Sequence, residues 1–276
     1  MAYGVRIGIR ANKPEFLDRF LGMIPDIWKP SSERLVDRLY SLQVGDDEAS
    51  GNGISSYHLY EDRNRVASST DMGFILDSCE SQLKMYLAEM ARRRVFVHAG
   101  AVGWRGEAII IPGRSFSGKT SLVAELVRAG ATYYSDEYAV LDNRGRVHPY
   151  ASPLALRDPV SFKQTRCSIE EFGGEKGIKP LPVGLVIVTR YEPGRLWRPR
   201  KLSAGKAMLE LLAHTIPVRR KPEAAINTLQ KVLAEAVTFK SVRGEAGGIV
   251  DFIFDSLNNA DGSPARVGRM PCFTRR

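Results

Sequence analysis

Residues 113–120 read GRSFSGKT, between an aliphatic segment, EAIIIP at 107–112, and an amphipathic segment, SLVAELVRAG at 121–130. The eight residues fit the pattern G-x-x-x-x-G-K-[S/T]. A strand that leads into a glycine-rich loop and then a helix suits phosphate binding, because backbone N–H groups surround the phosphates and the helix N-terminus adds its dipole. The stretch therefore predicts an α/β fold built on a strand–loop–helix unit that binds a nucleotide.

The residue types within the loop predict separate roles. Lys119 is a cation on a long stem that can reach the β- and γ-phosphates, and the Thr120 hydroxyl is placed to ligate Mg²⁺. The glycines allow the backbone to approach the phosphates closely. The serine hydroxyls either contact phosphate or are only small polar loop residues. The predicted nucleotide-binding residues are Gly113, Arg114, Ser115, Phe116, Ser117, Gly118, Lys119, Thr120 and Ser121.

An acidic pair, Asp136 and Glu137 in YSDEY, follows soon after the loop. We expect it to lie on a strand, where adjacent side chains point to opposite faces and so do not share one task. One carboxylate would serve Mg²⁺ while the other accepts a proton from an attacking hydroxyl. The alternative is an acidic strand edge without a catalytic role.

Together, HAGAV at 98–102 and GRSFSGKTSLVAELVRAGATYYSDE at 113–137 resemble the catalytic core of the HPr kinase/phosphorylase family. The resemblance covers about residues 95–142 and implies the P-loop kinase fold shared with phosphoenolpyruvate carboxykinase, with ATP and Mg²⁺ as cofactors. It implies that Asp136 is the base toward a serine hydroxyl, that Glu137 joins Thr120 at the metal, and that His98 lies near the γ-phosphate. The implied catalytic residues are Asp136, Lys119 and His98. From the residues alone, His98 could also be a packed strand histidine.

The sequence departs from this family at two places. Glu137 stands where the family has a second aspartate, and no E-x-R-G segment follows; SPLALRDP at 152–159 offers Arg157 and Asp158 instead. The expected function is an ATP- and Mg²⁺-dependent kinase acting on a hydroxyl, either a serine of a small protein or peptide or a group on a small molecule. The alternative is a nucleotide-binding regulator without phosphotransfer activity.

Changes of pattern divide the chain into three parts. We expect an N-terminal α+β domain at 1–94, an HPr kinase-like P-loop domain at 95–270 and a basic tail at 271–276. Strands are predicted at 3–10, 34–44, within 55–70, at 95–102, 107–112, 132–142 and 181–191, and helices at 13–22, 74–94, 121–130, 206–216 and 222–240. The glycine-rich segment 167–180 is either a lid over the substrate or a surface loop.

Composition limits the remaining function classes. The 276 residues carry 40 Lys and Arg against 31 Asp and Glu, and the three cysteines and four histidines are scattered. Any metal would therefore be held by oxygen ligands. The basic clusters lack the motifs of nucleic-acid-binding proteins, so we do not expect sequence-specific nucleic-acid binding; a nucleic-acid-binding module with a decayed site is a third alternative. We find no membrane span or secretory signal and predict a cytoplasmic protein; a homo-oligomer remains open.

Overall fold

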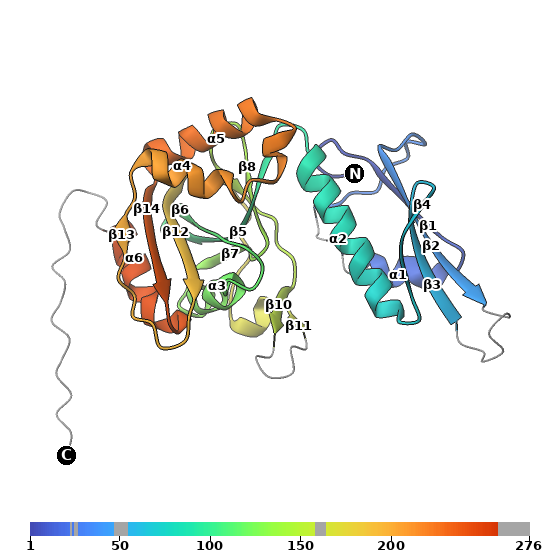
Figure 1. Cartoon of the computed structure of the whole chain (residues 1–276), viewed down its shortest axis with the longest axis horizontal. Coiled ribbons are helices and arrows are strands. Elements are labelled where there is room, and N and C mark those ends of the chain that lie inside the picture. Colours follow the sequence, from blue (N-terminus) through green and yellow to red (C-terminus); the bar gives the residue numbers. More distant parts are fainter. Residues whose placement is uncertain (23, 25–26, 47–54, 158–163, 259–276) are drawn as a thin grey trace, which may run out of the picture.

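The computed structural model describes residues 1–22, 24, 27–46, 55–157 and 164–258. Within these residues the chain is a mixed α/β protein with a small four-stranded sheet, an eight-stranded mixed sheet and six α-helices (Figure 1). The predicted basic tail, Asp158 and Cys272 lie outside the described residues. No helix in the described part of the chain is both long and apolar enough to cross a lipid bilayer.

The N-terminal unit consists of the small sheet and two helices. Its strands are β1 (Ile7–Ala11), β2 (Arg38–Asp46), β3 (Ser55–Glu61) and β4 (Asn64–Ser69), in the spatial order β1-β2-β3-β4. Only the β1–β2 pair is parallel. The helices α1 (Pro14–Leu21) and α2 (Met72–Met90) pack against the sheet through a core that includes Phe16, Phe20, Leu42, Leu59 and Leu83.

Helix α2 is shorter at its C-terminal end than the sequence predicts. Asp71 caps its first turn by accepting a hydrogen bond from Gly73 N at 2.8 Å. The helix stops at Met90 because Arg92 N donates to Tyr3 O at 2.8 Å and Arg93 has a positive φ of 56°. The prediction that the three arginines at 92–94 lie in the last helical turn is therefore wrong.

The large sheet begins with a hairpin made by the strands predicted at 95–102 and 107–112. Antiparallel β5 (Val95–Trp104) and β6 (Glu107–Pro112) are joined by a tight turn in which Arg105 and Gly106 both have positive φ. The spatial order is β13-β14-β12-β6-β5-β8-β9, and β7 also pairs with β5. The remaining strands are β7 (Thr132–Ser135), β8 (Tyr138–Leu141), β9 (Val147–His148), β12 (Val183–Tyr191), β13 (Arg200–Lys201) and β14 (Val237–Arg243).

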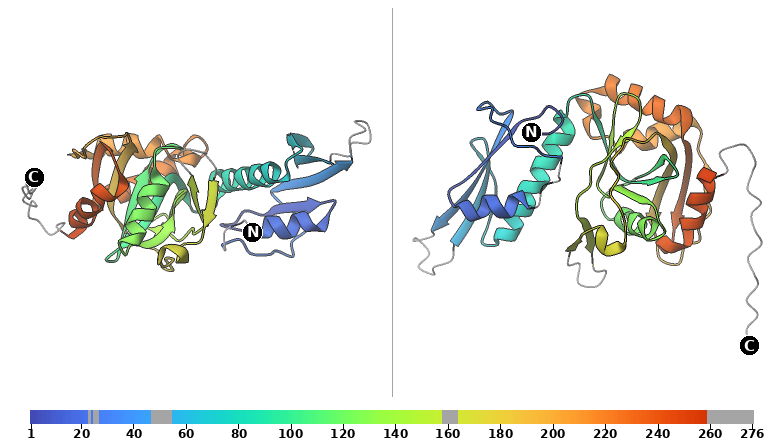
Figure 2. Two further views of the ribbon diagram at one scale, coloured as in Figure 1. Left: turned by 90° about the horizontal axis from the view of Figure 1, so that it is seen from below. Right: turned by 180° about the vertical axis from the view of Figure 1, so that it is seen from behind.

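Two layers of helices cover this sheet (Figures 1 and 2). The helices α3 (Lys119–Arg128) and α6 (Val250–Asn258) pack with Ile109 and Ile111, whereas α4 (Ala204–Leu212) and α5 (Pro222–Glu235) pack with Ile110. Ile109 and Ile111 face one helix layer and Ile110 faces the other, because successive side chains of a strand point to opposite faces of the sheet. Since β6, β12 and β14 are parallel, their carboxyl ends lie at one edge, which is where the loop 113–118 begins.

Two sequence predictions in this unit require correction. The predicted helix 222–240 ends at Glu235, and residues 237–243 form β14, which pairs in parallel with β12. Within the helix, Ile226 is 38% exposed, while Thr228 and Val232 are buried. The predicted strand 132–142 is interrupted at Asp136 and Glu137, because Ser135 Oγ accepts hydrogen bonds from the backbone N–H groups of Glu137 and Tyr138.

The glycine-rich segment 167–180 packs onto the large unit. It follows a two-stranded ribbon of β10 (Leu154–Arg157) and β11 (Gln164–Cys167). Tyr133 N donates to Glu175 O and Gly177 N donates to Tyr133 O, at 2.8 and 2.7 Å. These bonds extend the edge of β7.

An apolar cluster joins the two units. Ala2, Val5 and Leu87 from the N-terminal unit are buried together with Phe96, Tyr138 and Tyr150 from the large unit. The boundary expected near residue 94 therefore falls inside a shared core rather than in an exposed linker.

Candidate nucleotide-binding site

The loop between β6 and α3 has the backbone geometry that its glycines predict. Gly118 has a φ of 85°, a conformation that side chains disfavour. A Cβ on Gly113 would lie 2.6 Å from Ser117 Oγ, and one on Gly118 would lie 2.6 Å from an Arg243 guanidinium nitrogen. A side chain at Gly118 would be strained by the positive φ, and one at Gly113 would require Ser117 to move.

Lys119 lies inside this loop. Its Nζ donates hydrogen bonds to Gly113 O at 2.9 Å and Arg114 O at 2.8 Å, and the residue is 7% exposed. Burial lowers the pKa of Lys119 to about 8, although Asp136 and Glu137 oppose this shift. The ammonium is therefore placed where a phosphate can replace two backbone carbonyls as its partner.

Asp136 contacts the first turn of α3. Its carboxylate accepts a hydrogen bond from Thr120 Oγ1 at 3.0 Å and another from the Tyr133 hydroxyl at 2.9 Å. Asp136 is 7% exposed. A threonine hydroxyl and a carboxylate at this distance are two oxygen ligands of the kind that Mg²⁺ prefers.

Glu137 points to a different partner. Its carboxylate forms an ion pair with Lys84 of α2, with a separation of 2.7 Å, and the same ammonium lies 2.9 Å from Glu80. Burial disfavours the charged ammonium, but Glu137 and Glu80 outweigh it and raise the pKa of Lys84. The two adjacent carboxylates therefore act in different surroundings, as the sequence predicts, but the one beside Thr120 is Asp136.

His98 lies on β5 beside the loop. Its backbone N donates to His214 O at 2.7 Å, and its carbonyl accepts from Gly113 N at 3.3 Å. Burial, Lys119 and His214, in that order, lower the pKa of His98 to about 4. The imidazole is therefore uncharged at neutral pH.

The other predicted loop residues differ in exposure. Arg114, Ser115, Phe116 and Ser121 are exposed, and Phe116 has a positive φ of 65°. Ser117 Oγ is buried and has no hydrogen-bond partner within the described residues. Of the three serines, Ser117 thus has the hydroxyl that most needs an added partner.

The sequence did not identify Arg243. This arginine is 1% exposed and donates to Gly118 O at 2.7 Å and Gly244 O at 2.8 Å, so it supports the loop from behind. It was missed because the strand that carries it, 237–243, begins inside the segment predicted as a helix, 222–240. Lys84 was missed because only the folded chain brings α2 to Glu137.

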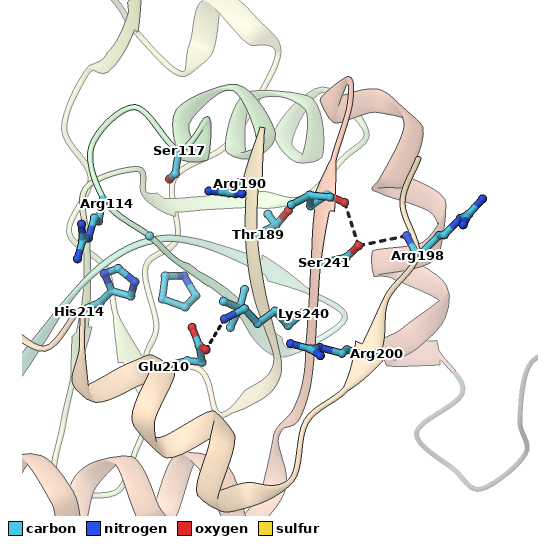
Figure 3. Close-up of a pocket in the computed structure, with 14 residues that line it drawn as sticks. Arg114, Ser117, Thr189, Arg190, Arg198, Arg200, Glu210, His214, Lys240 and Ser241 are labelled. Atoms are coloured by element: carbon cyan, nitrogen blue, oxygen red, sulfur yellow. Dashed lines mark hydrogen bonds and ion pairs between the residues drawn. The ribbon is translucent and has the colours of Figure 1, made fainter. Parts of the chain in front are cut away.

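A cavity of about 650 Å³ opens beside the loop at the carboxyl ends of the parallel strands (Figure 3). Ligands commonly bind at this edge of α/β sheets. It is lined by Pro112, Gly113, Arg114, Ser117, Val188, Thr189, Arg190, Arg198, Arg200, Glu210, His214, Lys240, Ser241 and Val242.

Comparison with models of known protein families finds no match, and no curated protein matches the sequence at a significant level. The resemblance to HPr kinase/phosphorylase therefore rests on the motif residues alone.

Proposed function

We propose that the chain is an ATP- and Mg²⁺-dependent kinase that transfers a γ-phosphate to a hydroxyl group. The observation that carries the proposal is the Thr120–Asp136 hydrogen bond next to the loop that holds Lys119. A phosphate-binding cation, a hydroxyl ligand and a carboxylate ligand thereby meet at one helix N-terminus, as phosphoryl transfer requires.

The residues fit a nucleotide-bound Mg²⁺ rather than a metal held by protein alone. Within the described part of the chain, no group of three or more His, Cys, Asp or Glu residues could hold a metal ion. Mg²⁺ commonly takes one or two protein ligands and completes its shell with phosphate oxygens and water. Thr120 and Asp136 would supply the protein ligands, and the bound ion would neutralise charge on the β- and γ-phosphates.

The chain's own residues would then have the following tasks. Lys119 binds the β- and γ-phosphates, and the loop N–H groups surround them. Asp136 holds the metal together with Thr120, a role that the resemblance gave to Glu137. His98 is uncharged and can accept the hydroxyl proton, with Asp136 as the other candidate base.

The acceptor is a hydroxyl, either a serine of a small protein or peptide or a group on a small molecule. Transfer of labelled γ-phosphate from ATP tests the proposal, with slow hydrolysis followed in parallel in case the acceptor is absent. Lys119→Ala should lower transfer or hydrolysis about 10²- to 10³-fold, because it removes a preorganised charge beside the transferred group. Lys206→Ala, on an exposed position of α4, is the control and should retain full activity.

A nucleotide-binding regulator is the second candidate. The ion pair between Lys84 and Glu137 connects the N-terminal unit to the residue next to Asp136, which would let nucleotide binding affect that unit. Mg²⁺-dependent ATP binding with neither transfer nor hydrolysis would favour the regulator and refute the kinase.

A further inference from the structure

The cavity beside the loop is lined by an excess of positive charge. Four different segments around it contribute cationic side chains: Arg114, Arg190, Arg200 and Lys240 (Figure 3). The wall also contains one acidic residue, Glu210. Lys240 forms an ion pair with Glu210, and Arg190 forms one with Glu192. The structure shows no ion pair within its described residues for Arg114 or Arg200.

This charge acts on a neighbouring side chain. Burial and Lys119 lower the pKa of His214, Glu210 opposes them, and Arg114 and Lys240 lower it further. Burial alone would disfavour an anion as well, so only the contributions of Lys119, Arg114 and Lys240 indicate a wall that attracts negative charge.

Two buried hydroxyls on the wall need partners. Thr189 is 8% exposed, and its Oγ1 has no hydrogen-bond partner among the described residues; the same holds for Ser117 Oγ. An unsatisfied buried hydroxyl costs free energy that a ligand oxygen or water can recover. Both oxygens are inaccessible to solvent, so a ligand would reach them only after a side-chain rotation; the guanidinium groups that line the cavity are the donors available to carboxylate or phosphate oxygens.

We infer that this cavity binds the anionic part of the phosphoryl acceptor, a molecule carrying carboxylate or phosphate groups besides its hydroxyl. The role as acceptor site rests on the proposed kinase function, whereas anion binding does not. Gly113, Arg114 and Ser117 belong both to the loop and to the cavity wall, so an anion held here lies next to the phosphate site. The volume falls in the usual range for small-molecule sites.

Calorimetric titration with citrate, in the absence of Mg²⁺, tests the inference. Citrate supplies three carboxylates and stands in for the acceptor. We expect wild-type protein to bind it and Arg200→Ala to weaken binding about tenfold, as expected for a lost charge-assisted contact. Lys201→Ala is the matched control, since Lys201 follows Arg200 in β13 but does not line the cavity.

ATP binding in the presence of Mg²⁺ separates this site from the nucleotide site. Arg200→Ala should leave the affinity for ATP within about twofold of wild type. Lys119→Ala should weaken ATP binding but retain citrate binding. A second titration uses phosphoserine. A larger loss of phosphoserine affinity than of citrate affinity in Arg200→Ala would indicate a phosphate-bearing acceptor, and the reverse would indicate an acceptor that carries carboxylates alone.

Three results would overturn the inference: no citrate or phosphoserine binding, binding that depends on Lys119 instead of Arg200, or an ATP affinity that falls with Arg200→Ala. The last result would assign the cavity to the nucleotide. Failure of the kinase proposal looks different, because transfer would be absent while citrate binding still depended on Arg200.

Discussion

At the scale of single residues, Lys119 combines burial with two carbonyl acceptors and no direct ion pair in the described structure. Burial lowers its pKa to about 8, so the side chain is close to losing its proton just above neutral pH. A bound triphosphate would raise this pKa, because it places negative charge against the ammonium.

Nucleotide affinity should therefore fall as pH rises through about 8. Below that pH both the free and the bound protein hold the proton and affinity is constant; above it, binding must take up a proton, and the dissociation constant should rise by up to about tenfold per pH unit. Titration of ATP with Mg²⁺ between pH 7 and 9.5 measures this.

Lys119→Arg provides the control, because arginine keeps its charge throughout this range. Its affinity for ATP should be lower than that of wild type but independent of pH. If the wild-type affinity for ATP is also independent of pH, either the Lys119 ammonium does not contact the phosphates or its pKa is not lowered.

At the scale of secondary structure elements, helix α2 contacts the candidate site through the Lys84 ammonium, which forms an ion pair with Glu137. Lys84 lies between Glu80 and Glu137, and its side chain is 10% exposed. Removing Lys84 would leave the buried carboxylate of Glu80 and the partly exposed one of Glu137 without its compensating charge.

Lys84→Met should lower the free energy of unfolding by about 2 to 4 kcal/mol. Denaturant titration measures the change, with Gln82→Ala on the exposed side of the same helix as the control. Adding Glu80→Met should recover part of the loss, because it removes one of the two carboxylates. Unchanged stability of Lys84→Met would show that the ion pair contributes nothing.

Local patterns predicted most elements but not where they end. The period of Leu122, Val123 and Leu126 predicted α3, and the aliphatic run of β12 predicted a buried strand, because burial dictates these patterns. Residues 236–240 were wrongly assigned to the helix because apolar residues continue from α5 without a glycine or proline. The break at Asp136 depends on the Ser135 hydroxyl, and the Lys84–Glu137 pair joins residues 53 positions apart. Neither leaves a signal in local sequence.

At the scale of the whole molecule, the candidate site lies between two different surroundings. Asp136 and Glu137 are on the side of β5, where the N-terminal unit packs through Leu87, Phe96 and Tyr138. The basic cavity is on the opposite side of β6, at the ends of β12 and β14. Under the proposed function, the loop 113–118 would connect an anionic ligand on one side with the N-terminal unit on the other.

The central claim is that Thr120 and Asp136 together hold the Mg²⁺ of a bound nucleotide. The most direct test is the affinity for ATP with and without Mg²⁺, in wild-type protein and in Asp136→Asn, with a thermal melt of each. Wild type should gain at least about tenfold in affinity from Mg²⁺, and Asp136→Asn should lose most of that gain, because an amide is a much weaker ligand than a carboxylate. A folded Asp136→Asn protein that keeps the full Mg²⁺ effect would contradict the account.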